Sequence, residues 1–241
     1  MRARVVLVTG STSGIGEATA RRFAEMGDTV VFNSRHSVEA GERLVAATPG
    51  SLYVRADISS AEECEGLLRR VLERFGRLDV LVNNAGVTKV IEHRDLEAAS
   101  VEVWREIFEV NVFGTWQLCV AAMPALKKSR GSIVIVSSAA GVRPTGSSIP
   151  YAASKAALNH VTALLAKVVG PEVRVNAVAP GLIDTPWTAD WETVRGFVQS
   201  VAPLRKSGSP EDVADVIVAL ATTSYVTGQV IVVDGGLTLA L

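Results

Sequence analysis

The sequence has few cysteines and no long apolar run, and these two absences exclude several kinds of protein. Its 241 residues include only Cys64 and Cys119, which lie far apart in helical patterns, so we expect buried thiols rather than a disulfide. No apolar stretch reaches the roughly 18 residues that a membrane-spanning helix needs. Residues 1–4 run straight into an apolar stretch without a small-residue cleavage site, so we expect no secretory signal and a cytoplasmic protein.

An excess of charge of one sign is also missing. The 24 lysines and arginines are balanced by 25 aspartates and glutamates, which leaves a net charge of −1. A chain without a basic excess lacks the electrostatic signature of proteins that bind nucleic acid or an anionic membrane surface. The histidines His36, His93 and His160 show no metal-ligand spacing, so no metal site is expected.

Short apolar runs rich in β-branched residues alternate with helical patterns along the whole chain. Strands are expected at 5–8, 29–32, 52–55, 80–83, 132–137, 174–179 and 229–234. Helices are expected at 14–26, 38–47, 60–75, 100–128, 151–169, 190–200 and 210–222. Repeated βα units predict an α/β fold, a doubly wound parallel sheet of the Rossmann type with about seven strands and helices on both faces. No linker or internal repeat interrupts the pattern, so we expect a single domain over residues 1–241.

A glycine-rich turn follows the first expected strand and opens the first expected helix. Its spacing is Gly-x-x-x-Gly-x-Gly, which differs from the commoner Gly-x-Gly-x-x-Gly pattern. A strand, such a turn and a helix together present N–H groups and a positive helix end to a phosphate, and a Cβ would block the approach. The turn therefore predicts a dinucleotide site. Its residues are Gly10, Ser11, Thr12, Ser13, Gly14, Ile15 and Gly16.

Tyr151 and Lys155 lie four residues apart, thirteen residues after Ser138. On a helix this spacing places a phenol and an ammonium on the same face. A cation beside a tyrosine favours the phenolate and lowers its pKa from about 10, so that the phenol can exchange a proton with an alcohol or a ketone. Ser138 could hold the same substrate oxygen. A surface tyrosine beside a solvated lysine is the alternative if the pair is taken alone.

Taken together, these motifs resemble the short-chain dehydrogenase/reductase family, and the resemblance covers nearly the whole chain. The members most similar in appearance are bacterial 3-oxoacyl-[acyl-carrier-protein] reductases. The matching segments are Thr9-Gly10-x-x-x-Gly14-x-Gly16, Asn83-Asn84-Ala85-Gly86, Asn111, Ser138, Tyr151-x-x-x-Lys155 and Pro180-Gly181.

The resemblance implies a catalytic set of Asn111, Ser138, Tyr151 and Lys155. Asn111 falls in the middle of the long helix expected at 100–128, where asparagine is a poor helix former. By resemblance it bends that helix and anchors a water bound to Lys155, which would complete a proton relay to Tyr151. An exposed asparagine is the alternative.

The resemblance also assigns cofactor contacts to the ends of several strands. Tyr151 and Lys155 would contact the cofactor as well, with Lys155 on the nicotinamide ribose. For Asp57 a helix cap remains an alternative, and for 83–86 an ordinary turn. The remaining implied contacts are Asp57 and Ile58 at the adenine, Asn84, Ala85 and Gly86 at the ribose, Pro180 and Gly181 at the strand end, and Ile183 and Thr185 at the nicotinamide carboxamide.

The second strand ends in Ser34 and Arg35, where an NAD-specific enzyme usually carries an acidic residue for the ribose 2′-hydroxyl. A hydroxyl and a guanidinium suit a 2′-phosphate, so NADP(H) is favoured over NAD(H). Many NADP-preferring relatives also carry a basic residue where this chain has Ser13, which leaves Arg35 as the main cation. A solvated loop arginine is the alternative.

The segment 185–204 resembles the variable lid that covers the substrate in this family. Trp187 and Trp191 are four residues apart and could share a helix face as an apolar wall, or pack into the core. Arg143 and Lys89 could meet a phosphate or carboxylate of a carrier, although solvation is favoured for both.

The expected function is an NADP(H)-dependent oxidoreductase that transfers a hydride between nicotinamide and a ketone or secondary alcohol. A 3-oxoacyl thioester, which could be carrier-linked, is the leading small-molecule substrate. The alternatives are a sugar, polyol or hydroxysteroid dehydrogenase and, in another class, a non-catalytic dinucleotide sensor. Apolar surface on helices 100–128 and 151–169 indicates a homotetramer, with a dimer as the runner-up.

Overall fold

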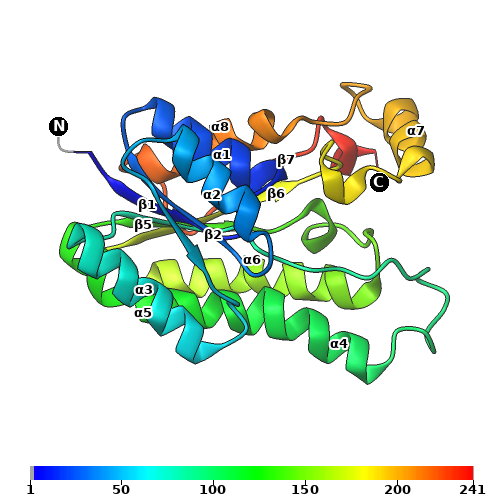
Figure 1. Ribbon diagram of the computed structural model, residues 1–241. Helices are drawn as coiled ribbons and strands as arrows, with labels where there is room; N and C mark the ends of the chain where they lie inside the picture. Colours follow the sequence, from blue (N-terminus) through cyan, green and yellow to red (C-terminus); the bar gives the residue numbers. More distant parts are fainter. Residues whose placement is uncertain (1–2, 241) are drawn as a thin grey trace.

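Seven strands form one parallel sheet in the computed structural model, which describes residues 3–240 (Figure 1). The strand order is β3-β2-β1-β4-β5-β6-β7. Most residues of the central strands are apolar and buried, as in sheets that helices cover on both faces, whereas the edge strands β3 and β7 are only partly buried. The predicted doubly wound α/β fold is confirmed. The strands are β1 (Val5–Val8), β2 (Thr29–Ser34), β3 (Leu52–Arg55), β4 (Val80–Asn83), β5 (Ser132–Val136), β6 (Arg174–Pro180) and β7 (Val230–Val233).

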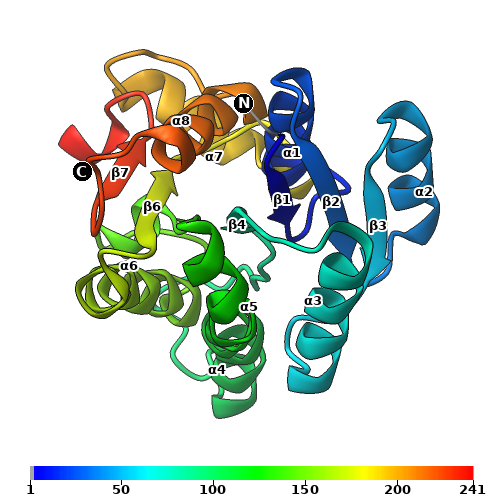
Figure 2. The same ribbon diagram turned by 90° about the vertical axis from the view of Figure 1, so that its left-hand side faces the viewer.

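Helices cover both faces of the sheet (Figures 1 and 2). One face carries α1 (Gly14–Glu25), α2 (Val38–Ala47) and α8 (Pro210–Thr222). The other carries α3 (Ala61–Phe75), α4 (Val101–Phe108), α5 (Thr115–Ser129) and α6 (Ile149–Val169). The helix α7 (Glu192–Val201) lies beyond the end of the sheet, beside the last residues of the chain.

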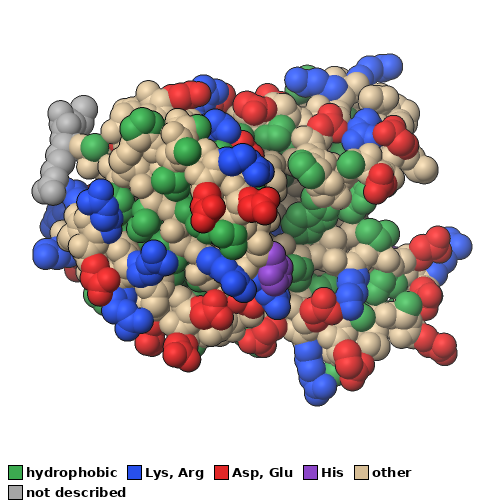
Figure 3. Space-filling model, viewed as in Figure 1, with side chains coloured by type: hydrophobic (Ala, Val, Ile, Leu, Met, Phe, Trp, Pro, Cys, Tyr) green, Lys and Arg blue, Asp and Glu red, His purple; other side chains and the backbone are tan. Residues whose placement is uncertain are grey.

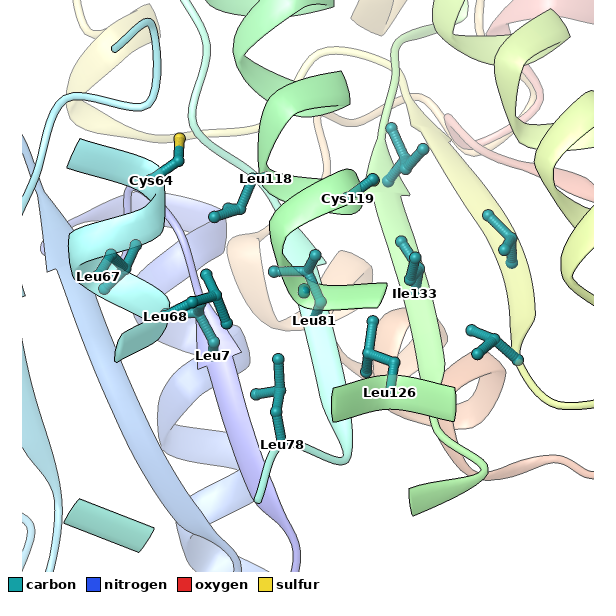
Figure 4. Close-up of a cluster of buried hydrophobic side chains, with 14 of the residues drawn as sticks. Leu7, Cys64, Leu67, Leu68, Leu78, Leu81, Leu118, Cys119, Leu126 and Ile133 are labelled. Carbon is teal, nitrogen blue, oxygen red and sulfur yellow. The ribbon is translucent and has the colours of Figure 1, made fainter. Parts of the chain in front are cut away.

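The two cysteines lie in the core between the sheet and its helices. Figure 4 shows Cys64 on α3 and Cys119 on α5 among leucines that include Leu67, Leu81 and Leu118. Both are buried free thiols, as expected.

The helix expected at 100–128 is not α-helical throughout. A π-helical segment at Glu109–Gly114 separates α4 from α5, with Asn111 at its centre. Such segments widen the helix by one residue and are frequent at functional sites. The helices expected at 60–75 and 210–222 begin after Ser60 and Ser209, whose hydroxyls each accept a hydrogen bond from the backbone N–H three residues on.

The strand order reverses between β1 and β4, which are neighbours in the sheet although β2 and β3 lie between them in the chain. Ligands of doubly wound folds bind at such a point, outside the carboxyl ends of the strands. Within residues 3–240 no helix is long and apolar enough to cross a membrane, and no group of His, Cys, Asp and Glu residues could hold a metal ion.

Candidate active site

The glycine-rich turn after β1 has a backbone that only glycine adopts easily. Gly10 and Gly14 have φ values of +59° and +55°, in the left-handed region. A Cβ on Gly16 would collide with the Gly10 carbonyl and the Asn84 side chain. No side chain caps the first turn of α1, so its N–H groups face the turn without a side-chain partner and are available to an anion.

Thr9 joins this turn to the one after β4. Its hydroxyl accepts hydrogen bonds from the Asn84 and Ala85 N–H groups, both at 3.0 Å. The Asn84 amide donates in return to the carbonyls of Thr9 at 2.9 Å and Gly10 at 3.1 Å. The sequence showed Thr9 only as the start of the glycine motif, and its bridging role depends on the adjacency of β1 and β4.

Asn111 is fully buried, which excludes the exposed alternative. Its Oδ1 accepts from the Val87 N–H at 2.8 Å, and its Nδ2 donates to the Val87 carbonyl and to Ser154 Oγ, both at 3.0 Å. The π-helical segment is therefore tied to the loop after β4 and to α6. A Cβ on Gly86 would lie 3.1 Å from Asn111 Oδ1 and 3.6 Å from Lys155 Nζ, so these groups surround one point.

Lys155 is a buried cation, with only 4% of its surface exposed. Its Nζ donates to the Val136 carbonyl at 2.8 Å and lies 5.7 Å from the centre of the Tyr151 ring. Burial lowers the pKa of Lys155 to about 8, because removal from water disfavours the charged form.

Tyr151 lies near the start of α6, where Ser148 caps the helix by accepting from its N–H at 3.3 Å. Burial raises the pKa of the Tyr151 phenol, and a hydrogen bond with Ser138 opposes this effect. The expectation that Lys155 lowers the pKa of Tyr151 is not met in this structure. The Lys155 ammonium donates to the Val136 carbonyl, so desolvation of the phenol dominates.

The residues at the carboxyl ends of β2 and β3 are paired with one another. Ser34 is buried, and its Oγ forms a hydrogen bond of 2.8 Å with the Tyr53 hydroxyl. Arg35 Nε lies 2.9 Å from Asp57 Oδ2 and forms an ion pair with it. Partial burial opposes ionisation of Asp57, yet hydrogen bonds from Ser59 and the charge of Arg35 hold its pKa below the usual range. Asp57 accepts from the Ser59 N–H at 3.0 Å and does not cap α3.

One cavity of about 420 Å³ lies along the carboxyl ends of the strands and collects most of the expected site residues. Outside its lining are Ser11, Gly16, Ser34, Arg35, Asp57, Ile58 and Asn111, of which Ile58 is packed in the core. The expected residues that line it are Gly10, Thr12, Ser13, Gly14, Ile15, Asn84, Ala85, Gly86, Ser138, Tyr151, Lys155, Pro180, Gly181, Ile183 and Thr185.

The outer wall of the cavity is apolar. Trp187 lies in the 3₁₀ turn Pro186–Thr188, whereas Trp191 precedes α7 and packs beside Val198 and Leu237. The two indoles therefore do not share a helix, but both line the cavity. Figure 3 shows a notch beneath the α7 region with hydrophobic side chains exposed in it.

The two cations considered for a carrier differ in their surroundings. Lys89 is paired with Glu106 at 2.6 Å. Arg143 has no carboxylate within 4.0 Å among the described residues, and its Nε donates to the Thr238 carbonyl at 3.3 Å. Lys89 thus has an acidic partner, whereas Arg143 has none among residues 3–240.

Comparison with known families matches residues 10–238 to a family described as enoyl-(acyl carrier protein) reductase. A Streptomyces violaceoruber protein, provisionally assigned as ketoacyl reductase 2 of the granaticin polyketide synthase, is 56% identical over 97% of this chain and 96% of its own. The Thermotoga maritima 3-oxoacyl-[acyl-carrier-protein] reductase FabG is 40% identical, with 98% of each chain covered.

A solved structure from Burkholderia xenovorans has the same fold. That protein, provisionally assigned as a short-chain dehydrogenase/reductase, superposes with a TM-score of 0.92 over 99% of each chain at 36% identity. The similarity in sequence and the similarity in fold thus indicate the same family of proteins.

Proposed function

Since the chain belongs to the short-chain dehydrogenase/reductase family, we propose that it reduces a 3-oxoacyl thioester with NADPH. Membership makes it an oxidoreductase that acts on ketone or alcohol groups with a nicotinamide dinucleotide. The observation that carries the finer proposal is the meeting of Ser138, Tyr151 and Lys155 with the glycine turn in one cavity. The ketoacyl reductases among its relatives support the substrate class.

The residues present fit a dinucleotide. Gly10 and Gly16 let the turn pack closely against the Asn84–Ala85 turn, and a Cβ on Gly14 would reach Thr185 Cγ2 at 3.1 Å across the cavity. In the proposed arrangement Asn84, Ala85, Gly86 and Lys155 hold the nicotinamide ribose side. Pro180, Gly181, Ile183 and Thr185 hold the carboxamide side. Asp57 and Ile58 lie at the adenine end.

In the proposed reaction the cofactor supplies the hydride when bound. Ser138 donates a hydrogen bond to the substrate carbonyl oxygen, and Tyr151 transfers its phenolic proton to that oxygen as the alcohol forms. The raised pKa of Tyr151 keeps the phenol protonated at neutral pH, as a general acid requires. Lys155 places a positive charge beside the phenolate that remains. Asn111 fixes the loop after β4 against α6 and so orients this set.

A substrate panel tests the proposed function. Oxidation of NADPH should be fastest with β-ketoacyl thioesters such as acetoacetyl-CoA or an N-acetylcysteamine thioester. Diketones, quinones, sugars and ketosteroids complete the panel. Faster turnover of sugars than of thioesters would contradict the proposal, and tight NADPH binding without turnover of any ketone would support a sensor.

A hydroxysteroid dehydrogenase is the second candidate. The outer wall of the cavity carries Trp187, Val194 and Phe197, which are 47%, 43% and 49% exposed. Such an apolar wall suits a large hydrophobic ketone better than a sugar or polyol. Ketosteroid reduction faster than that of thioesters would favour this candidate.

We propose Arg35 and Ser34 as the residues that recognise the 2′-phosphate and favour NADP(H). The change Arg35→Ala should raise KM for NADPH by about tenfold or more, the effect of one lost charge-assisted hydrogen bond. KM for NADH should stay within about twofold, because NADH carries no 2′-phosphate. Steady-state kinetics with both cofactors measures this. An unchanged KM for NADPH would show that the ion pair with Asp57 is the only role of Arg35.

We propose a homotetramer, with a dimer as the runner-up, in which α5 and α6 meet their counterparts. Their outer faces expose Trp116, Val120, Leu164 and Val168 by 48% to 70%, whereas Leu158 on α6 is buried within the subunit. Apolar surface of this extent is typical of subunit interfaces.

The change Trp116→Glu should therefore produce a smaller species in light scattering coupled to gel filtration, because a carboxylate would be buried at the contact. The matched control is Leu72→Glu, at a 37% exposed site on α3, which should leave the mass unchanged. Equal masses for Trp116→Glu and the wild type would exclude this surface from the assembly.

We further propose that residues 1–241 form one domain in which residues 185–204 are the lid over the substrate. We also propose a cytoplasmic location, where two buried thiols remain reduced.

A further inference from the structure

Asp184 lies at the start of the lid and binds two other segments through its carboxylate. Its Oδ1 accepts from Arg195 Nε of α7 at 3.0 Å, and its Oδ2 accepts from Ser207 Oγ at 2.5 Å. Asp184 directly precedes the lid and Ser207 follows it within three residues. One side chain thus joins both ends of the lid to the helix within it.

Backbone hydrogen bonds also join the two ends of the lid. The Asp184 N–H donates to the Gly208 carbonyl, and the Gly208 N–H donates to the Leu182 carbonyl, both at 2.9 Å. Ile183 and Gly208 form a short parallel bridge. The lid therefore leaves and re-enters the domain at one point that backbone hydrogen bonds fix.

Arg195 holds that middle part. Besides Asp184, its guanidinium donates to the Thr188 carbonyl at 3.2 Å and to Glu192 Oε1 at 2.9 Å. Its side chain is only 19% exposed, whereas that of Glu192 is 82% exposed. A planar guanidinium can bond several acceptors at once in a fixed geometry. Arg195 therefore ties α7 to the 3₁₀ turn that carries Trp187 and to the base of the lid.

We propose that Asp184, Arg195 and Ser207 form a latch that sets the position of the apolar substrate wall. Trp187 lies next to Thr188, and Val194 and Phe197 lie on α7, so all three move with the segments that Arg195 joins. The members of the latch are positioning residues, because none of them lines the cavity that holds the proposed reaction. This inference rests on the proposed function of that cavity.

The latch also connects two parts of the site. Asp184 lies between Ile183 and Thr185, which are proposed to hold the nicotinamide carboxamide. The carboxylate that positions the substrate wall is therefore part of the segment that contacts the cofactor. A change at Arg195 should disturb the wall alone, whereas a change at Asp184 should disturb both contacts.

Kinetics of Arg195→Gln give the first test. With acetoacetyl-CoA and NADPH we expect KM for the thioester to rise about five- to twentyfold, with kcat and KM for NADPH within about twofold, since the wall is displaced and the proton-transfer set is not. The change Arg195→Lys should restore part of the affinity for the thioester, because lysine keeps the positive charge but lacks the planar group that bonds several acceptors at once. The control Arg21→Gln removes an exposed ion pair on α1 and should change nothing.

Hydrogen–deuterium exchange of the cofactor-free proteins gives a second test that needs no substrate. Amides in 186–201 should exchange faster in Arg195→Gln and Asp184→Asn than in the wild type, and the double variant should add little to either single change. Unchanged exchange in the single variants would overturn the latch. Faster exchange with an unchanged KM for every ketone that the wild type reduces would overturn its positioning role.

The two tests separate this inference from the proposed function. If the wild type reduces no thioester, the proposed function fails and the exchange experiment still decides whether the latch holds the lid. In that case KM is measured with whichever ketone of the panel is reduced.

Discussion

Replacing Tyr151 with phenylalanine should lower turnover by about 10²-fold or more, the usual scale for loss of an acid–base group. The phenol is the proposed proton donor, and phenylalanine keeps its shape while removing the hydroxyl. Because the ring keeps its place on α6, NADPH should still bind with an affinity within about threefold of the wild type. Single-turnover oxidation of NADPH and a fluorescence titration of NADPH measure the two quantities.

A matched control for this change is Tyr225→Phe, since the Tyr225 side chain is fully exposed. It should leave both turnover and cofactor affinity unchanged. Near-full activity of Tyr151→Phe would mean that another group protonates the substrate. Loss of NADPH binding together with turnover would assign Tyr151 to the cofactor rather than to proton transfer.

Replacing Lys155 with methionine should abolish turnover and yet stabilise the cofactor-free protein. The drop in the pKa of Lys155 from 10.5 to about 8 corresponds to roughly 3 kcal/mol of unfavourable burial at neutral pH. Methionine removes this cost but leaves the Val136 carbonyl without its partner, a loss of about 1 kcal/mol or more. The expected net gain in the free energy of unfolding is about 2 kcal/mol at pH 7, measured by urea denaturation.

The pH dependence of stability gives a second check on Lys155. Its pKa is lower in the folded state, so between pH 8 and 10.5 the unfolded chain binds more protons at this site. The free energy of unfolding therefore rises with pH over this window. The destabilising effect of the buried charge on Lys155 is fully present below pH 8. The difference in stability between Lys155→Met and the wild type should shrink as the pH approaches 10.5.

The control for this change is Lys167→Met, at an exposed position of the same helix. It should change the free energy of unfolding little, both at pH 7 and near pH 10.5. A destabilised Lys155→Met would show that the bond to Val136 outweighs the cost of burying the charge.

The strands and the glycine turn were predictable from the sequence because their signals are local. Fully buried parallel strands appear as continuous apolar runs, and Gly10 and Gly14 mark positive φ values within a few residues of β1. More than half of the expected element ends coincide with those of the structure, and the others differ by one or two residues, as with β2, which continues to Ser34.

The parts of the site that could not be predicted depend on contacts between distant segments. The family resemblance implied that Asn111 bends its helix, but no local pattern reveals its bonds to Val87 and Ser154. The pKa of Tyr151 is raised by its burial, and the Lys155 ammonium donates its hydrogen bond to the Val136 carbonyl. Both depend on how distant segments pack. The pairing of Arg35 with Asp57 likewise depends on the neighbouring ends of β2 and β3.

The two core cysteines give this protein an internal reporter of global opening. Burial raises the pKa of Cys64 to about 11 and that of Cys119 to about 12. At neutral pH almost no thiolate is present in the native state, and alkylating reagents attack the thiolate. Modification by iodoacetamide must therefore await exposure of the layers around α3 and α5, so its rate records how often the molecule unfolds.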